Sequence, residues 1–206
     1  MRQIPRPPLM VITDSELAGG RLLSIVDECL TAGCRWFMVR EKKMPAESVK
    51  ELTLSIVRRA EKYSATVVVN NYPKLVHETG AAGVHLPWGS DIESARYIVG
   101  EDRLVGVSAH STEQALKAER LGADYVTLSP VFASISKAGY HNPAGLQMLR
   151  ETVQHLSIPV IALGGVRPGN AWSCIANGAA GVAVLGAVMT SKPYDVVLSL
   201  IEEIGG

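Results

Sequence analysis

The sequence has no excess of charge of either sign and few aromatic side chains. Its 206 residues contain 20 Lys and Arg, 20 Asp and Glu, and only 5% Phe, Trp and Tyr. Nucleic-acid binding normally requires a basic surface for the phosphates and aromatic rings on which bases stack. The composition therefore argues against a nucleic-acid partner.

Long hydrophobic runs are also missing. Runs such as Thr66–Val69 and Val182–Leu185 are far shorter than the roughly 18 residues that a membrane-spanning helix needs. The first ten residues contain three prolines and lack the continuous apolar stretch of a signal peptide. We therefore expect a cytoplasmic protein that has no membrane partner.

Cysteine is scarce. Cys29, Cys34 and Cys174 are odd in number, show no CxxC spacing and have no accompanying cluster of histidines. This pattern argues against a disulfide framework and against a structural zinc site. We expect all three to be small residues of the hydrophobic core.

What the sequence does contain is a repeated unit, in which a short apolar run is followed by a turn and a helical pattern. Nearly continuous hydrophobicity in such runs is typical of a parallel sheet buried on both faces. Eight units predict a single (β/α)8 TIM barrel over residues 1–206, and an open doubly wound sheet is disfavoured because no GxGxxG follows the first run. The predicted strands are Leu9–Thr13, Trp36–Arg40, Thr66–Asn70, Gly83–Leu86, Leu104–Ser108, Tyr125–Leu128, Pro159–Leu163 and Gly181–Leu185.

The carboxyl ends of barrel strands carry function, and glycines follow the last two predicted strands. Gly164 and Gly165 precede a helix expected to begin near Pro168, and Gly186 and Ala187 follow the eighth strand. Glycine lets backbone N–H groups approach an anion at a helix start, although it also simply permits tight turns. Two such sites favour a phosphate-bearing small molecule as the ligand.

Cationic side chains are expected around the same mouth. Arg40 and Lys42 are two residues apart at the end of the second strand, and Lys137 lies in the loop after the sixth. Together they indicate an anionic ligand, and the alternative is a solvated ion-paired surface with Glu41 and Glu47. Two loop serines could donate hydrogen bonds to phosphate oxygens: Ser134 and Ser136.

Two of the five histidines are candidates for proton transfer. His110 follows the fifth strand and His141 lies in the loop after the sixth. His85 falls inside the fourth strand, where a hydrogen-bonded core histidine is the default, and His77 and His155 fall in helical stretches that we expect at the surface.

A set of short motifs, in this order along the chain, resembles the thiamine phosphate synthase/TenI family over essentially the whole length. The matching pieces are Val11-Ile12-Thr13-Asp14, Val39-Arg40-Glu41-Lys42, Val69-Asn70-Asn71, Gly83-Val84-His85-Leu86, Ser108-Ala109-His110-Ser111, Ser129-Pro130-Val131-Phe132, Ser136-Lys137, Gly145-Leu146, Ile158 to Gly165 and Gly181 to Ala187.

The resemblance implies a thiamin-biosynthesis enzyme that binds a thiazole phosphate. The synthase branch joins a pyrimidine diphosphate to a thiazole phosphate with release of diphosphate, and two acids hold Mg²⁺ on the diphosphate. Here Asn71 and Ser90 stand at the acid positions, and Met38 replaces a glutamine of the family pattern. The resemblance implies that six residues keep the places of the family pattern: Arg40, Lys42, Asn70, Ser134, Ser136 and Lys137. We also expect substrate contacts from Asn71, Ser108, Gly145, Gly164, Gly165, Gly186 and Ala187.

The departures decide which branch the sequence favours. Leu86–Ser90 resembles the TenI branch, whose thiazole tautomerases need no metal, so tautomerase chemistry with no cofactor is our first interpretation. Pro130 stands where the tautomerase pattern has its catalytic histidine, which leaves Lys137, His110 and His141 as catalytic candidates. The alternatives are a thiamine phosphate synthase with a weakened Mg²⁺ site, in which Asp91 could substitute for an acid, and a non-catalytic binder of thiazole phosphate. The sequence leaves open whether the protein forms a homo-oligomer.

Overall fold

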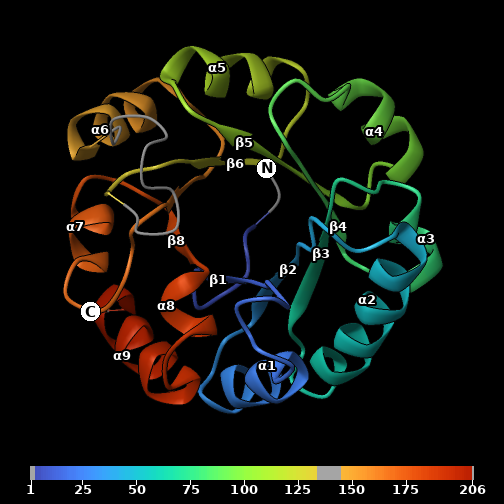
Figure 1. The fold of residues 1–206 in the computed structure, drawn as a ribbon. Helices are drawn as coiled ribbons and strands as arrows, with labels where there is room; N and C mark the ends of the chain where they lie inside the picture. The colour runs from blue at the N-terminus through green and yellow to red at the C-terminus, as the bar shows by residue number, and fades with distance from the viewer. Residues whose placement is uncertain (1–2, 134–144, 206) are drawn as a thin grey trace.

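Eight parallel strands alternate with helices and close into a barrel (Figure 1). The computed structural model describes residues 3–133 and 145–205. The elements are β1 (Leu9–Ile12), α1 (Leu22–Thr31), β2 (Trp36–Val39), α2 (Ala46–Glu61), β3 (Thr66–Asn70), α3 (Leu75–Thr79), β4 (Gly83–Leu86), α4 (Ile92–Val99), β5 (Leu104–Ala109), α5 (Thr112–Arg120), β6 (Tyr125–Leu128), α6 (Gly145–His155), β7 (Val160–Leu163), α7 (Ala171–Ala176), β8 (Gly181–Val184), α8 (Gly186–Met189) and α9 (Pro193–Gly205).

Each strand pairs in parallel with the next along the chain, and the last pairs with the first. Leu9 of β1 lies opposite Val182 of β8, and Met10 lies opposite Trp36 of β2. The helices surround the ring of strands in Figure 1. The predicted (β/α)8 TIM barrel is therefore confirmed, because the ring of strands is closed and helices cover its outside.

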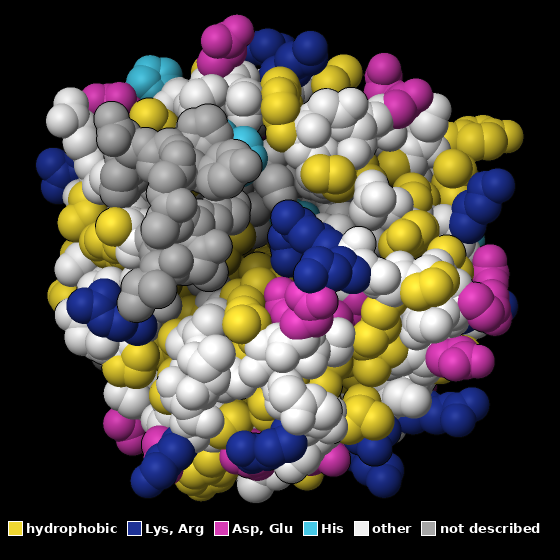
Figure 2. All heavy atoms as spheres, in the orientation of Figure 1, with side chains coloured by type: hydrophobic (Ala, Val, Ile, Leu, Met, Phe, Trp, Pro, Cys, Tyr) yellow, Lys and Arg dark blue, Asp and Glu magenta, His cyan; other side chains and the backbone are white. Residues whose placement is uncertain are grey.

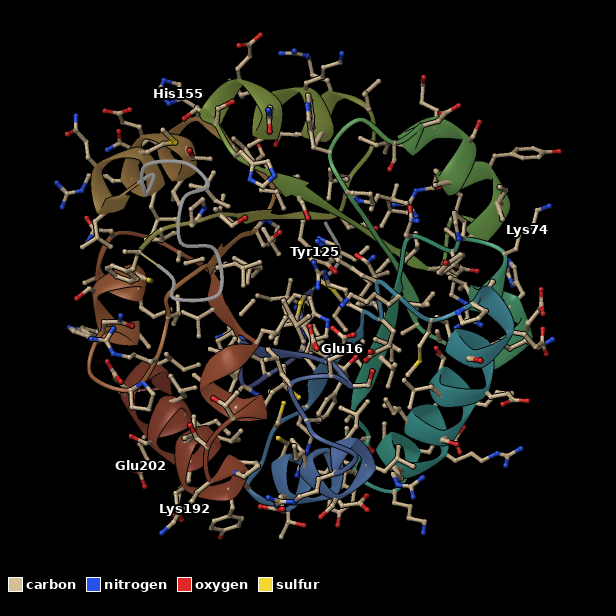
Figure 3. All side chains as sticks on the ribbon, viewed as in Figure 1. Glu16, Lys74, Tyr125, His155, Lys192 and Glu202 are labelled. Atoms are coloured by element: carbon tan, nitrogen blue, oxygen red, sulfur yellow. The ribbon has the colours of Figure 1, made fainter. Side chains whose placement is uncertain are left out.

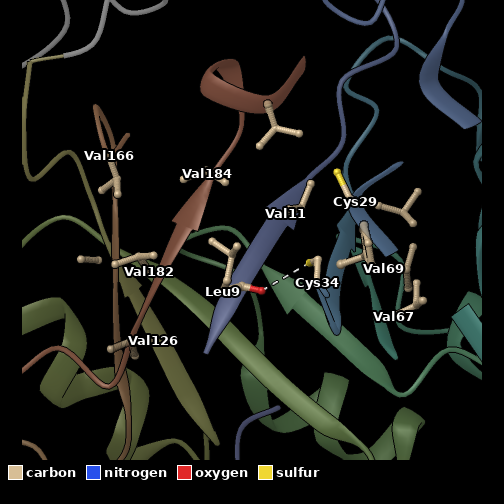
Figure 4. Close-up of a cluster of buried hydrophobic side chains, with 14 of the residues drawn as sticks. Leu9, Val11, Cys29, Cys34, Val67, Val69, Val126, Val166, Val182 and Val184 are labelled. Carbon is tan, nitrogen blue, oxygen red and sulfur yellow. Dashed lines mark hydrogen bonds between the residues drawn. The ribbon is translucent and has the colours of Figure 1, made fainter. Parts of the chain in front are cut away.

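Alternation along the strands divides the core into an inner and an outer part. The outer part fills the space between strands and helices, and Figure 4 shows members such as Val11, Val182 and Cys34. All three cysteines are free and buried, as expected, and burial raises the pKa of the Cys34 thiol to about 12. The inner part consists of Met10, Ile12, Trp36, Met38, Val68, Tyr125, Ile161 and Ala183.

Several predicted strand ends were wrong by one residue, and one has a clear cause. The prediction included Thr13, Arg40 and Leu185 as last residues, whereas β1, β2 and β8 end one residue earlier. The Arg40 N–H donates to the Thr13 hydroxyl at 3.0 Å instead of continuing a ladder of backbone bonds. Likewise, β7 begins at Val160 rather than Pro159, and β5 continues past Ser108 to Ala109.

The helix expected near Pro168 begins later, at Ala171. Asn170 accounts for the delay, because its side chain accepts from the Arg167 N–H at 2.9 Å and donates to the Gly165 carbonyl at 3.0 Å. Side-chain bonds of this kind compete with helical backbone bonds. Among the helices within residues 3–133 and 145–205, none has both the length and the apolar character needed to cross a bilayer.

Candidate functional site

A cavity of about 1130 Å³ opens where the strands end, and the ends of β1 to β8 or the loops directly after them contribute to its wall. Figure 2 shows Lys and Arg side chains gathered near the centre of this face, with Asp and Glu side chains directly beside them. The cavity lies at the carboxyl ends of the strands, where barrel enzymes place their active sites.

The cationic side of the cavity contains Arg40 and Lys42, which both line it as predicted. Their neighbour Glu41 is buried and fixes the loop after β1. Its carboxylate accepts from the Thr13 hydroxyl at 2.7 Å, and from the Ser15 N–H at 2.9 Å and the Ser15 hydroxyl at 2.7 Å. These bonds tie the ends of β1 and β2 together and hold the backbone from which Arg40 projects.

Arg40 is charged and only partly solvated. Burial lowers the pKa of its guanidinium, while the carboxylates of Asp14 and Glu41 oppose that shift. An arginine stays protonated under these conditions and can bind a phosphate through two parallel N–H donors. Glu47, which belongs to the alternative of an ion-paired surface, lies 3.9 Å from the Lys50 ammonium.

The glycine side lies at the ends of β7 and β8, where Gly164, Gly165, Gly186 and Ala187 line the cavity. Gly164 and Gly165 have φ values of +96° and +67°. A Cβ on Gly164 would lie 2.6 Å from the Cα of Pro130, so glycine is also needed here to leave space for the chain that follows β6. Gly186 has open space where a Cβ would point, and it begins α8, whose first N–H groups have no acceptor within the helix.

Between these two sides the cavity wall contains polar side chains. Asn70, Asn71, Ser108 and His110 all line the cavity. The His110 Nδ1 lies 2.7 Å from the Ser129 carbonyl oxygen, which can only accept, so Nδ1 carries a proton. In the neutral ring Nε2 is then the unprotonated nitrogen, which is the state that a general base requires.

Several cavity residues were not singled out as site residues from the sequence, among them Tyr72, His85, Trp88 and Arg167. His85 was interpreted as a core histidine, and it is indeed only 1% exposed, yet it also lines the cavity floor. The centre of the Trp88 ring lies 5.9 Å from the Lys117 ammonium nitrogen. Trp88 stands two residues after the fourth predicted strand, and this place at a strand end was the signal that could have identified it as a cavity residue.

A magnesium ion does not fit the described residues. Mg²⁺ on a phosphate substrate is usually anchored by one or two carboxylates. Glu41 is the sole carboxylate among the described cavity residues, and both of its oxygens already accept hydrogen bonds. Asp91 caps α4 instead, accepting from the Ser94 N–H at 2.9 Å and its hydroxyl at 2.7 Å. No group of three or more acidic, His or Cys side chains in the described ranges is arranged for a metal.

Four predicted site residues lie outside the described residues: Ser134, Ser136, Lys137 and His141. Gly145 begins α6, where its N–H donates to the Val131 carbonyl at 3.1 Å, and it is not among the described residues of the cavity wall. His77 and His155 are exposed, as expected, and Figure 3 shows His155 on the outer ring of helices.

The chain matches one protein family over most of its length. The model of the family described as thiamine monophosphate synthase matches residues 9–188. A putative thiamine-phosphate synthase of Geobacter sulfurreducens is 39% identical, covering 88% of this chain and 86% of that protein. The thiamine-phosphate synthase of Moorella thermoacetica is 35% identical over 98% of this chain and 97% of its own length.

A solved structure agrees with this result over nearly the whole chain. The thiamine phosphate pyrophosphorylase from Pyrococcus furiosus superposes with a TM-score of 0.86 at 31% identity and covers 96% of both chains. The names of these relatives favour the synthase alternative over the tautomerase interpretation. This chain therefore belongs to the thiamine monophosphate synthase family of thiamine biosynthesis.

Proposed function

We propose that this protein is a thiamine phosphate synthase, which joins a pyrimidine diphosphate to a thiazole phosphate and releases diphosphate. The observation that carries the proposal is a single cavity with two separate features suited to anions, Arg40 and Lys42 on one side and the Gly164–Gly165 and Gly186–Ala187 ends on the other. Its volume of about 1130 Å³ is slightly above the usual range of about 300–1,000 Å³ for pockets that hold one small ligand. One bound thiazole phosphate would leave the cationic side unused.

The reaction requires stabilisation of negative charge on the departing diphosphate, because breaking its bond to the pyrimidinylmethyl group leaves the electron pair on oxygen. Arg40 can donate two parallel hydrogen bonds there, and Lys42 adds a second positive charge. We extend this role to Lys137 as a phosphate clamp, on its sequence position alone. Holding the thiazole phosphate on the glycine side keeps the ring nitrogen near the carbon that it attacks.

Neutral residues stand at the two positions where the synthase pattern has acids. Asn71 lines the cavity without a negative charge, and Asp91 is committed to capping α4. We therefore propose that the cationic side chains neutralise much of the diphosphate charge that a metal would otherwise carry, and that catalysis depends only weakly on Mg²⁺.

A second candidate function is thiazole tautomerase activity, and one observation favours it. The His110 ring has its Nδ1 proton held by the Ser129 carbonyl, so its Nε2 can accept a proton in the cavity. Moving a proton on a thiazole carboxylate phosphate needs no diphosphate site. A non-catalytic thiazole phosphate binder is the third possibility.

Direct turnover separates these functions. The full chain is incubated with pyrimidine diphosphate and thiazole phosphate, with Mg²⁺ or with a chelator, and thiamine phosphate is measured by chromatography. We expect product in both conditions, with Mg²⁺ changing the rate less than about tenfold. Matched reactions with a thiazole carboxylate phosphate report tautomerase activity. Tautomer conversion without condensation would reject the synthase, and binding without either reaction would indicate a silent binder.

The variant Asn71→Asp provides an internal comparison. It returns a carboxylate to a cavity position whose φ of +67° an aspartate tolerates well. If the missing acids explain the weak dependence on Mg²⁺, this variant should respond more strongly to the metal than the wild type. Identical Mg²⁺ titrations of the two proteins would contradict that explanation.

A further inference from the structure

A chain of hydrogen bonds leads from the inside of the barrel to the cavity floor. The Nδ1 of His85 lies 3.2 Å from the Tyr125 hydroxyl, and its Nε2 lies 3.0 Å from the Ser108 hydroxyl. Tyr125 is fully buried, and Figure 3 labels it inside the ring of strands. Ser108 and His85 both line the cavity. His85 therefore connects a hydroxyl that no ligand can reach with one that a ligand can.

The surrounding side chains hold this network in place. Trp36 packs edge-on against the Tyr125 ring, with 5.0 Å between the ring centroids. Gly106 of β5 leaves the necessary space, because a Cβ there would lie 2.1 Å from the Tyr125 Cζ and 2.6 Å from the His85 Nδ1. The Thr127 hydroxyl is a more distant neighbour of Nε2, at 3.4 Å. Neither ring can turn without disturbing the inner core.

The His85 ring is neutral at ordinary pH. Burial, with a smaller contribution from the positive charge of Arg40, lowers its pKa to about 3. A neutral imidazole has one N–H donor and one acceptor nitrogen. The network then has two arrangements: Tyr125 donates to Nδ1 and Nε2–H donates to Ser108, or Ser108 donates to Nε2 and Nδ1–H donates to Tyr125.

The surroundings of Tyr125 favour the first arrangement. Among the hydrogen bonds of the described residues, the bond to His85 is the only one that the Tyr125 hydroxyl makes. In the second arrangement its own proton would be buried without an acceptor, which costs about 1–3 kcal/mol. In the first arrangement, the Tyr125 hydroxyl donates its proton to Nδ1, and the Ser108 proton is directed away from His85.

We infer that His85 and Tyr125 are positioning residues that hold Ser108 as a hydrogen-bond donor toward an acceptor atom of the substrate. This inference rests on the proposed function, since it assigns the floor of the same cavity. It gives a role to a buried histidine that touches neither the cationic nor the glycine side. The substrate atom that fits is an unprotonated ring nitrogen or an anionic oxygen, because only an acceptor can use this proton.

Nitrogen NMR tests the arrangement without any substrate. In the ¹⁵N-labelled full chain at pH 7, the His85 resonances should show the Nε2–H tautomer. Tyr125→Phe keeps the aromatic ring against Trp36 but removes the donor, so the preference for this tautomer should weaken. A wild-type ring with its proton on Nδ1 would overturn the inference.

Kinetics test whether His85 acts through Ser108. We expect Ser108→Ala and His85→Leu each to lower kcat/KM for condensation about tenfold, and the double variant to lose no more than either one. His85→Gln, whose amide N–H₂ can still donate to Ser108, should stay within about threefold of the wild type. The affinity for inorganic diphosphate should fall together in Ser108→Ala and His85→Leu if the acceptor is a diphosphate oxygen, and should stay unchanged in both if it is a ring nitrogen.

The two arms distinguish failure of the inference from failure of the proposed function. Additive losses in the double variant, or a loss in His85→Gln equal to that in His85→Leu, would overturn the positioning role. A wild type that shows the expected tautomer but forms no thiamine phosphate would reject the proposed function, while the NMR result would still support the hydrogen-bond arrangement.

Discussion

The two sides of the cavity are built differently. On the β2 side, Arg40 lines the cavity and Glu41 anchors the loop beside it through three hydrogen bonds. On the β7 and β8 side the lining includes Gly164, Gly165, Gly186 and Ala187, whose backbone groups can approach a ligand, together with exposed side chains such as Arg167 and Thr190. The first side attracts an anion by charged side chains, and the second adds oriented N–H groups to the charge of Arg167. Truncation should therefore damage the first side, and addition of a group should damage the second.

The largest effect is expected from adding charge to the glycine side. Gly186→Asp should weaken thiazole phosphate binding about 100-fold or more, because it puts a carboxylate beside the phosphate. The matched control is Gly186→Ala, since a Cβ at this position meets nothing within 4 Å. Calorimetry measures both affinities, and thermal unfolding checks that both variants fold. An unchanged affinity in Gly186→Asp would mean that the phosphate does not bind on this side.

Truncation of the cationic side should have the next largest effect. Arg40→Ala should weaken inorganic diphosphate binding about 30-fold, in keeping with the loss of hydrogen bonds from a charged group. Its affinity for thiazole phosphate should change less than about threefold. Lys43→Ala is the control, because Lys43 is exposed and pairs with Glu16 at 2.9 Å. Equal losses for both ligands in Arg40→Ala would mean that the two sides are one site.

The floor between the two sides should respond to pH. His85 has a folded-state pKa of about 3, below the value of 6.5 in the unfolded chain. Its contribution to stability is therefore complete above pH 6.5 and is lost as the pH falls toward 3, since only the unfolded chain takes up the proton. Between pH 7 and pH 5 the loss is about 2 kcal/mol.

Denaturant unfolding at several pH values measures this loss. The variant His85→Gln does not titrate there, so its stability should fall by about 2 kcal/mol less than that of the wild type over the same interval. Parallel pH profiles for the two proteins would show that His85 is not held neutral by its surroundings.

The smallest expected effect concerns the support beneath Arg40. Glu41→Gln keeps the size of the side chain but replaces one acceptor oxygen with an N–H₂ group, which cannot accept from Ser15. We expect diphosphate affinity to fall about tenfold, with the free energy of unfolding lower by about 1–2 kcal/mol. Glu47→Gln on the exposed start of α2 is the control. If both variants bind diphosphate as the wild type does, the Glu41 bonds do not position Arg40.

The sequence was informative where one pattern has one physical meaning. Repeated apolar runs with helical spacers predicted the barrel, because a parallel sheet must be covered on both faces. Because the carboxyl ends of all strands meet at one rim in this fold, the sequence could place four residues at the mouth of the barrel: Arg40, Lys42, Gly164 and Gly186. Spacing could not reveal that Gly164 is also needed for contact with Pro130, because that contact joins two different loops.

His85 shows the other limit of sequence reasoning. A histidine within an apolar strand predicts a buried, hydrogen-bonded ring, and that expectation is correct. Its second neighbour, Ser108, comes from a strand 23 positions along the chain, and their meeting depends on the register in which His85 lies opposite Gly106. Register across a closed barrel follows from packing of the whole inner core, which no local pattern encodes.

Simultaneous binding of two anions tests the central claim most directly. Thiazole phosphate is titrated into the protein by calorimetry, alone and in the presence of saturating inorganic diphosphate. With separate cationic and glycine sides, the Kd for thiazole phosphate should stay within about threefold, and a ternary complex should form. A Kd that rises in proportion to the diphosphate concentration would mean that both anions compete for one site, and it would contradict the account.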